Sequence, residues 1–386
     1  FYEDVHDMVN KYHDTTFYLI CSNIKDFKFI NEIFGMEKGN QVLIKQAKLM
    51  ASNPSERTIC ARLMNDRFAL CLPREEFDEK RVADSIKELQ REFSGNSFHL
   101  HTYMGVYEIR DRDEAVSIMV DKANIAADTI KNNYDCCVAY YDEHLLEISI
   151  EQRRLLGEFE PALQNDEFVM YLQPQVKRDG AAKGAEALVR WVHPSRGILT
   201  PYAFIDILEN AGLIYKLDLY IWEKAAQKLA EWKEKGYGSY HISVNISTKD
   251  FYIIDIYETF TGLINKYGIA ASNLHLEITE TTLMTDFEKN MNIIHKLQGV
   301  GFRVEIDDFG SGYSSLNMLK DISADVLKID MGFLRKSENE VKGQDILESI
   351  ITLAGKIGMD VITEGVETKK QLDMLTMMGC HEFQGY

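Results

Sequence analysis

Seven polar positions in the second half of the chain each stand at the end of a short apolar run. They are Glu186, Asn245, Glu277, Asp307–Asp308, Lys328, Glu364 and Gln384. From Asn245 onward, successive positions lie 20 to 36 residues apart, about the length of one strand and one helix. The runs themselves, such as His241–Asn245 and Val361–Glu364, are typical of buried parallel strands. The repetition predicts an α/β fold, a TIM-like (β/α)8 barrel, in which the strand ends gather at one mouth.

This mouth would collect four carboxylates, those of Glu186, Glu277, Asp307 and Asp308. Four like charges in one place cannot all stay ionised unless bound cations compensate them, so we expect a metal site. The alternative is that each polar residue only caps a helix or solvates a loop, which is the commoner role of a single such residue. Seven residues of metal-binding or phosphate-binding type in one phase are difficult to explain by capping alone.

The composition bounds the class of protein. A chain of 386 residues, 45% hydrophobic and 27% charged, suits two soluble globular domains. No apolar stretch approaches the length of a membrane span, and the first residues lack a signal-peptide pattern. Because both ends look truncated, we expect a cytoplasmic protein or the cytoplasmic part of a longer membrane-anchored or sensor protein. The six cysteines are scattered and indicate reduced, buried side chains, not disulfides or a zinc site.

The net charge of the chain bears on its partners. A value of −18 argues against DNA, because contacts to a phosphate backbone need a basic surface. The same negative charge means that an anionic substrate would bind only where local cations compensate it. Divalent metal ions at the predicted mouth would supply those cations.

A series of motifs extends from about residue 160 to the end of the chain. The motifs are EALVRW at Glu186–Trp191, SVNIS at Ser243–Ser247, LEITE at Leu276–Glu280, DDFGSGYSSL at Asp307–Leu316, LKID at Leu327–Asp330, EGVE at Glu364–Glu367 and QGY at Gln384–Tyr386. In order and spacing, residues 160–386 resemble the EAL domains, the cyclic di-GMP phosphodiesterases. The resemblance implies hydrolysis of cyclic di-GMP to the linear dinucleotide pGpG. Met331–Gly332 departs from the family, which usually has Arg-Ser there, without an expected effect on the metal site.

The resemblance also implies roles for individual residues. The implied metal ligands, for two Mg²⁺ or Mn²⁺ ions, are Glu186, Asn245, Glu277, Asp307, Asp308 and Glu364, with Glu364 acting directly or through water. The implied substrate contacts are Gln173, the backbone around Leu188, Arg190, Asp330 and Glu367. All-oxygen ligation favours magnesium or manganese over zinc. The barrel is also expected to form a homodimer, as related domains do.

Three further residues are implied to act in catalysis. Lys328 would position or deprotonate the attacking water, and its pKa should fall beside the cations. Its alternative role is a plain ion pair with the aspartates. Gln384 would orient a metal-bound water, and Glu280 would hold the glycine-containing loop at Gly310–Tyr313.

Residues 1–145 alternate predicted strands and helices and predict an α+β domain with a central antiparallel sheet. A strand at Phe17–Cys21 is followed by one amphipathic helix through about Ala51, and a hairpin is expected around Asn65–Asp66. The segments Phe27–Asn31 and Ala61–Phe68 resemble the GGDEF domain, the cyclic di-GMP synthase fold. The departures from that family are informative. The signature hairpin has Met64 and Asn65 in place of two glycines and Arg67 in place of an acidic residue, and two expected aspartates are Asn23 and Lys25.

A synthase that lacks its magnesium ligands should be inactive. Two interpretations of this domain remain open: a structural or dimerising module, and a module that senses a nucleotide and regulates the barrel. Residues 142–165 are predicted to form a charged amphipathic helix between the domains, which either transmits a domain rotation or simply packs on the barrel. For the whole chain, the alternative to an enzyme is a receptor that binds cyclic di-GMP without cleaving it.

Overall fold

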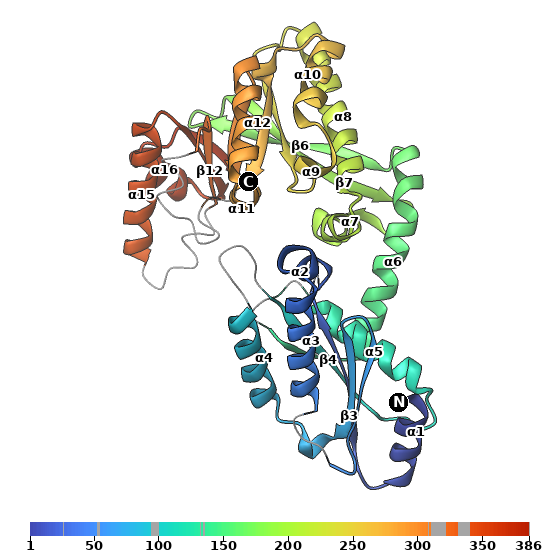
Figure 1. The fold of residues 1–386 in the computed structure, drawn as a ribbon. Helices are drawn as coiled ribbons and strands as arrows, with labels where there is room; N and C mark the ends of the chain where they lie inside the picture. Colours follow the sequence, from blue (N-terminus) through green and yellow to red (C-terminus); the bar gives the residue numbers. More distant parts are fainter. Residues whose placement is uncertain are drawn as a thin grey trace. The chain divides into compact units, whose positions relative to one another are not determined.

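The computed structural model describes residues 1–25, 27–51, 55–93, 100–131, 133, 136–307, 309, 322–330 and 340–385. Contacts between residues divide the chain into two compact units, Phe1–Arg154 and Leu155–Tyr386 (Figure 1). Asp308, Tyr386, the loop at Gly310–Tyr313 and the departure at Met331–Gly332 lie outside the described residues.

The first unit is built on a five-stranded sheet with the order β2-β3-β1-β4-β5. The strands are β1 (Phe17–Ile24), β2 (Ile59–Met64), β3 (Arg67–Pro73), β4 (Thr102–Glu108) and β5 (Val138–Tyr140). β1 pairs antiparallel with β3 and β4, β2 pairs antiparallel with β3, and β5 runs parallel to β4. The predicted α+β domain with a mainly antiparallel central sheet is therefore confirmed, including the hairpin between β2 and β3.

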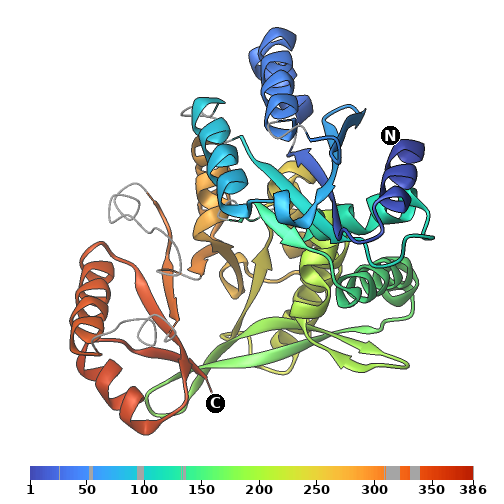
Figure 2. The same ribbon diagram turned by 90° about the horizontal axis from the view of Figure 1, so that it is seen from below.

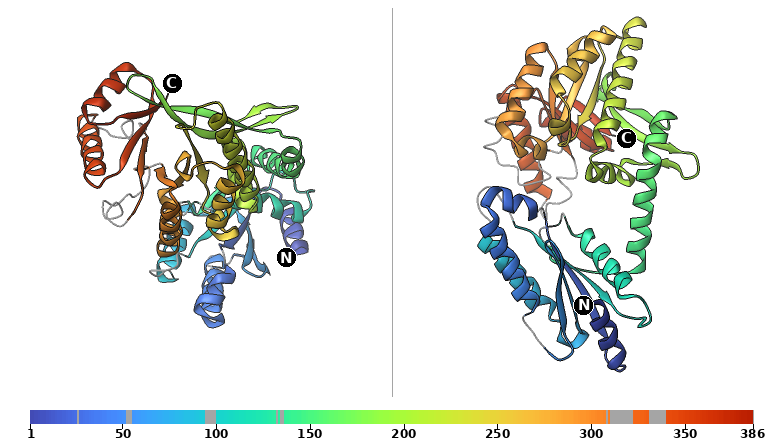
Figure 3. Two further views of the ribbon diagram at one scale, coloured as in Figure 1. Left: turned by 90° about the horizontal axis from the view of Figure 1, so that it is seen from above. Right: turned by 45° about the vertical axis from the view of Figure 1, so that its right-hand side comes forward.

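Helices cover both faces of this sheet. They are α1 (Tyr2–Lys11), α2 (Phe27–Phe34), α3 (Met36–Met50), α4 (Glu79–Phe93) and α5 (Val116–Thr129). In β1, Ile20 packs in the hydrophobic cluster with α3 and α4, whereas Leu19 packs in the cluster with α1 and α5. Figure 3 shows helices on both sides of this sheet. The all-apolar run of β1 thus buries both of its sides. The sequence predicted one helix where α2 and α3 lie, but they are separated at Gly35, whose φ of 83° suits glycine.

The second unit is a closed barrel of strands. They are β6 (Phe168–Lys177), β7 (Ala182–His193), β8 (Gly197–Leu199), β9 (His241–Ile246), β10 (Leu274–Thr279), β11 (Arg303–Asp307), β12 (Val326–Asp330), β13 (Asp360–Val366) and β14 (Glu382–Gly385). The order is β6-β14-β13-β12-β11-β10-β9-β7-β8, and β6 also pairs with β7, which closes a ring that leaves β8 outside. The TIM-like barrel is therefore confirmed.

The first strand of the ring departs from the regular (β/α)8 pattern. β6 runs antiparallel to both of its neighbours, β7 and β14, because a short turn joins it directly to β7. The other neighbouring pairs in the ring, from β7 through β9 to β14, are parallel. Parallel strands end at the same side of a barrel, so the polar positions that end these strands are brought to one mouth.

Helices lie on the outside of this ring (Figure 2). They are the part of α6 (Glu143–Gln164) that begins at Leu155, α7 (Ile205–Ala211), α8 (Ile214–Glu234), α9 (Asp250–Ile253), α10 (Ile256–Tyr267), α11 (Glu280–Thr285), α12 (Phe287–Val300), α15 (Glu340–Lys356) and α16 (Lys369–Met377). The core between helices and strands contains Trp191, Trp222 and Phe260. In the described part of the chain, no helix is long and apolar enough to cross a membrane.

Candidate active site at the barrel mouth

The ammonium group of Lys328 lies at the centre of a carboxylate cluster. Its Nζ atom is 2.8 Å from Glu277 Oε2, 2.6 Å from Glu364 Oε1, 3.2 Å from Glu186 Oε2 and 3.3 Å from Asp307 Oδ1. Lys328 comes from β12, and its partners come from β10, β13, β7 and β11. The side chain of Lys328 is 1% exposed and that of Glu277 is fully buried. The strands therefore bring five of the predicted site residues within hydrogen-bonding or ion-pairing distance.

The charges in this cluster are not balanced, because four carboxylates surround one ammonium group. Burial acts to lower the pKa of Lys328, but Glu277 and the other carboxylates raise it well above its ordinary value. This direction is opposite to the fall expected from the sequence, which presupposed cations at the site. Burial raises the pKa of Glu364 to about 7, and burial followed by the charge of Glu186 raises that of Glu277 well above its ordinary value.

The donor atoms of the cluster show whether divalent cations fit it. Glu277 has one carboxylate oxygen, Oε1, that is buried and has no hydrogen-bond partner in the described part of the chain. A buried acceptor without a donor is costly, and a cation would satisfy it. The donor set consists of carboxylate and amide oxygens, which are the ligands that Mg²⁺ and Mn²⁺ prefer. The residues present therefore fit such ions, and Asp308 is a further candidate ligand that lies outside the described residues.

Three side-chain amides, those of Asn245, Gln384 and Gln173, lie beside the carboxylates. Asn245 on β9 donates from Nδ2 to Glu186 Oε1 over 3.3 Å. Gln384 on β14 donates from Nε2 to Glu186 Oε2 over 2.5 Å and to Gln173 Oε1 over 3.3 Å. Strand pairing explains this proximity, because Glu277 is the direct partner of Asn245, and Gln173 is that of Glu186. Asn245, Gln173 and Gln384 therefore lie in the same cluster, as expected.

The other described site residues predicted from the sequence lie within β7 or close to the ends of β10, β12 and β13. Arg190 on β7 donates from Nη1 to the carbonyl of Val189 over 2.8 Å, and its guanidinium carbon lies 5.9 Å from the Tyr171 ring centre. Glu280 is the first residue of α11 and directly follows β10. The others are Leu188 in β7, Asp330 at the end of β12 and Glu367 after β13.

A pocket of about 480 Å³ adjoins the cluster. Leu188 and Asn245 line it, together with two acidic residues that the sequence analysis missed, Glu209 and Asp218. Burial, followed by the charge of Asp250, raises the pKa of Asp218 well above its ordinary value, and burial raises that of Asp250. Asp250 Oδ1 is buried without a hydrogen-bond partner among the described residues. A proton on Asp218 would be shared by the two carboxyl groups in a hydrogen bond. An acidic residue within the apolar pattern of α8 was the available signal.

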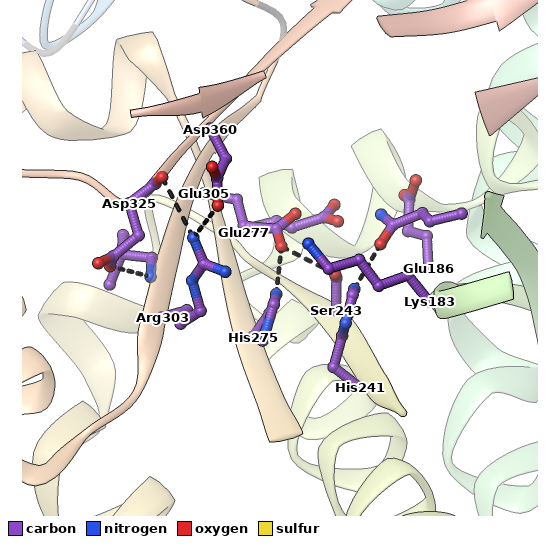
Figure 4. Close-up of polar contacts among 12 residues, drawn as sticks. Lys183, Glu186, His241, Ser243, His275, Glu277, Arg303, Glu305, Asp325 and Asp360 are labelled. Atoms are coloured by element: carbon purple, nitrogen blue, oxygen red, sulfur yellow. Dashed lines mark hydrogen bonds and ion pairs between the residues drawn. The ribbon is translucent and has the colours of Figure 1, made fainter. Parts of the chain in front are cut away.

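A second group of missed polar residues lies in the barrel interior (Figure 4). His275 Nδ1 lies 2.5 Å from Glu305 Oε1, which also accepts from Ser243 Oγ over 3.2 Å. The rings of His241 and His275 stack with centres 3.8 Å apart and planes 2° apart. Burial acts to raise the pKa of Glu305, but the hydrogen bond from His275 lowers it to about 2. The sequence signal was the presence of ionisable residues inside apolar strands.

In the first unit, the hairpin between β2 and β3 carries several of the residues that depart from the GGDEF pattern. Met64 is 69% exposed at the end of β2, where the related family has a glycine. Asp66 Oδ2 accepts a hydrogen bond from the backbone nitrogen of Ile24 over 3.3 Å. Asn23 on the neighbouring strand is buried. These residues offer a cation less negative charge than the aspartates of the family would.

Two protein-family models match the chain. Residues 2–135 match the diguanylate cyclase, GGDEF domain, and residues 157–386 match the EAL domain. A GGDEF domain followed by an EAL barrel defines the class of protein. The EAL match covers more than half of the chain, and the chain belongs to the EAL domain family.

Curated relatives share similarity along almost the whole chain. The bifunctional diguanylate cyclase/cyclic di-GMP phosphodiesterase MucR of Pseudomonas aeruginosa is 30% identical over 383 residues, which cover 97% of this chain and 55% of MucR. The cyclic di-GMP phosphodiesterase PdeR of Escherichia coli is 26% identical over 372 residues, which cover 95% of this chain and 56% of PdeR. The chain thus spans about half the length of the curated relatives it matches.

Solved structures are also similar to this chain. The PaMucR phosphodiesterase in its c-di-GMP complex is 34% identical, with a TM-score of 0.57, and the match covers 60% of this chain and 94% of that one. The S helix-GGDEF-EAL structure of Vibrio cholerae LapD, bound to c-di-GMP, has a TM-score of 0.61 and covers 100% of this chain and 93% of that one. At 20% identity, the LapD match shows the fold alone.

Proposed function

We propose that the barrel hydrolyses cyclic di-GMP to linear pGpG in a reaction that requires divalent cations. The observation that carries the proposal is the convergence of Glu186, Glu277, Asp307 and Glu364 on Lys328 at the barrel mouth. The similarity to PaMucR in its c-di-GMP complex and to the cyclic di-GMP phosphodiesterase PdeR supports the choice of substrate.

In this reaction, water attacks one of the two phosphodiester phosphorus atoms in line with the leaving 3′ oxygen. A new P–O bond forms, the P–O3′ bond breaks, and the 3′ oxygen takes up a proton. Glu186, Asn245, Glu277, Asp307, Asp308 and Glu364 would hold two Mg²⁺ or Mn²⁺ ions. When bound, such ions polarise the phosphate and make water more acidic.

Lys328 would act on the attacking water from the floor of the mouth. Its Nζ lies within 3.3 Å of four carboxylates, so its proton is held tightly until cations compensate those charges. With the carboxylates compensated, Nζ becomes a better proton acceptor and can position or deprotonate water. Gln384 would help to orient water at the mouth through Glu186, which accepts a hydrogen bond from Gln384 Nε2.

The substrate would lie across the mouth and extend into the adjoining pocket. Arg190 suits the phosphate that is not cleaved, because a guanidinium group binds two phosphate oxygens in parallel. Gln173, Leu188, Asp330 and Glu367 would provide further contacts. The pocket beside Leu188 has a volume of about 480 Å³, which is within the range of small-molecule sites.

The first unit would not synthesise cyclic di-GMP. Asn23, Lys25 and Arg67 stand where a synthase would carry acidic residues, and a magnesium ion needs oxygen ligands of negative charge. The unit would instead have a structural or regulatory role. Residues 1–145 and 160–386 would be the two functional domains, and the EAL barrel would form a homodimer, which light scattering during size-exclusion chromatography would test.

The deciding experiment is incubation of the purified chain with cyclic di-GMP and MnCl2, followed by chromatographic separation of nucleotides. Accumulation of pGpG, and its loss in excess EDTA, is expected. The matched control is Glu186→Gln, which keeps the size of the side chain but removes one ligand charge. Tight binding of cyclic di-GMP without any pGpG would replace the enzyme with the alternative, a cyclic di-GMP receptor.

A further inference from the structure

Three side chains form a hydrogen-bonded chain from the interior of the barrel to Glu186. His241 Nε2 lies 2.7 Å from Gln175 Oε1, and Gln175 Nε2 donates to Gln384 Oε1 over 3.2 Å. Gln384 Nε2 then donates to Glu186 Oε2 over 2.5 Å. All four residues are buried, with exposed fractions between 0% and 6%. The chain therefore runs where water does not compete for its hydrogen bonds.

The direction of every hydrogen bond in this chain is fixed. Gln384 Nε2 donates to Glu186 and Gln384 Oε1 accepts from Gln175, so the NH2 group of Gln384 faces Glu186 and its oxygen faces Gln175. Gln175 must then donate to Gln384 and present its own oxygen to His241. His241 is consequently the tautomer that carries a proton on Nε2. Burial lowers the pKa of His241 to about 3, so the ring is neutral and has one such proton.

The position of His241 is itself held by its surroundings. Its ring stacks on that of His275, and His275 is held by Glu305. On another side, a Cβ atom added to Gly184 would lie 2.3 Å from His241 Nε2, so this strand position must remain glycine for the ring to fit. Gly184 lies two residues before Glu186 on β7, which links the space for His241 to the strand that carries the metal-ligand candidate.

We infer that His241 and Gln175 are positioning residues, which act through Gln384 to set the orientation of Glu186 for cation binding. The inference rests on the proposed function only in taking Glu186 as a cation ligand. Partners that orient a metal ligand typically contribute 10- to 100-fold to metal affinity. A residue two hydrogen bonds further away should contribute less, about three- to tenfold.

The two stacked histidines and Glu305 have another interpretation, because their ligand atoms lie within 4.8 Å of one another and could hold a metal ion. The stacking geometry argues against it. A metal ion lies near the plane of each imidazole that binds it, and two planes 2° from parallel with ring centres 3.8 Å apart share no such point. His241 Nε2 is also already engaged by Gln175.

The test is a double-mutant cycle on Mn²⁺ affinity, measured without substrate by the EPR signal of free Mn²⁺. The four proteins are the unaltered chain, His241→Phe, Gln384→Ala and the double variant, with Glu186→Ala as the baseline for binding elsewhere. His241→Phe keeps a ring on His275 but cannot donate to Gln175. We expect it to weaken Mn²⁺ binding about three- to tenfold in the unaltered background and less than twofold in the Gln384→Ala background.

Two further variants keep the test decisive. Gln175→Leu removes the middle of the chain and should reproduce the effect of His241→Phe, which covers the case of a His241→Phe protein that does not fold. His193 is a buried histidine that is hydrogen-bonded to Glu158 and does not belong to the hydrogen-bonded series from His241 to Glu186. His193→Phe should therefore leave Mn²⁺ affinity unchanged. Equal effects of His241→Phe in both backgrounds, or no effect of either variant, would overturn the inference. Because the measurement needs no turnover, failure to form pGpG would contradict the proposed function and not this inference.

Discussion

Lys328 on β12 donates a hydrogen bond to Glu277 on β10 over 2.8 Å, although the two residues are 51 positions apart in the sequence. One strand, β11, lies between β10 and β12 in the barrel. Each side chain exposes at most 1% of its surface. Burying such a pair costs desolvation energy, and three further carboxylates lie around the same ammonium group. Four carboxylates around one ammonium group leave an excess of negative charge that cations can neutralise. The arrangement therefore favours cation binding and lowers the stability of the fold when cations are absent.

Replacing Lys328 should separate its catalytic and structural contributions. We expect Lys328→Ala to lower turnover by about 10²- to 10⁴-fold, the usual contribution of a positioned acid or base, while cyclic di-GMP still binds. In EDTA, the free energy of unfolding should fall by about 3–5 kcal/mol, because the carboxylates lose their buried partner. Steady-state kinetics and denaturant unfolding would measure the two effects.

The matched control for this substitution is Lys216→Ala. Lys216 forms an exposed ion pair with Glu160 on the outer side of the barrel, so its loss should change neither turnover nor stability appreciably. Near-normal turnover of Lys328→Ala would reduce Lys328 to a partner in an ion pair.

Divalent cations should stabilise the barrel as well as activate it. At 100 times its dissociation constant, a bound ion adds about 2.7 kcal/mol to the free energy of unfolding. We therefore expect Mn²⁺ or Mg²⁺ to raise the melting temperature of the second unit, measured by calorimetry, and Glu186→Ala to abolish most of this shift. Calcium should bind but support little turnover, because its larger and looser coordination misplaces the attacking water. Undiminished pGpG formation in excess EDTA would contradict the metal requirement.

The Asp218–Asp250 pair should make stability depend on pH. The pKa values of both carboxyl groups are raised in the folded state, so between their ordinary and raised values the folded protein binds more protons than the unfolded one. Stability from this pair is therefore fully present at low pH and is lost as the pH rises through that window. Asp218→Asn should leave stability at pH 4 nearly unchanged and raise the melting temperature at pH 8 by about 2–4 °C for each kcal/mol gained.

Calorimetry across that pH range would measure the effect. Glu234→Gln, at an exposed position near the end of the same helix, removes the same charge from the surface and is the control. If Asp218→Asn and Glu234→Gln shift the melting temperature equally at pH 8, the carboxyl groups of Asp218 and Asp250 do not share a proton.

The first unit should be inactive as a synthase. Incubation with GTP and Mg²⁺ is expected to give no cyclic di-GMP, even in a Glu186→Ala background that preserves any product. The combined substitutions Met64→Gly, Asn65→Gly and Arg67→Glu should still not give synthase activity. Asn23 and Lys25 would provide no negatively charged oxygen ligands on the other side of the cation. Mass spectrometry of the nucleotides would decide, and any synthesis by the unaltered first unit would show that it retains a functional metal site.

The sequence predicted the barrel because strand-forming runs and polar strand ends recur in one phase, and this periodicity is a local property. The same phase placed Glu186, Asn245, Glu277, Asp307, Lys328 and Glu364 at one mouth, since parallel strands all end on the same side. The antiparallel direction of β6 was not predicted, because the residue pattern of a single strand does not determine its direction relative to its neighbours. The break between α2 and α3 at Gly35 was also missed, because glycine inside a helical pattern is often tolerated.

Tertiary structure alone decided the electrostatics and the interior contacts of the barrel. The direction of the pKa shift of Lys328 depends on which carboxylates lie within about 3 Å of its Nζ, a distance that sequence separation does not determine. Likewise, His241, Gln175 and Gln384 are distant along the chain and look like ordinary polar exceptions within apolar strands. They form one directed hydrogen-bonded chain only because closure of the barrel between β6, β7 and β14 brings their side chains into the same buried space.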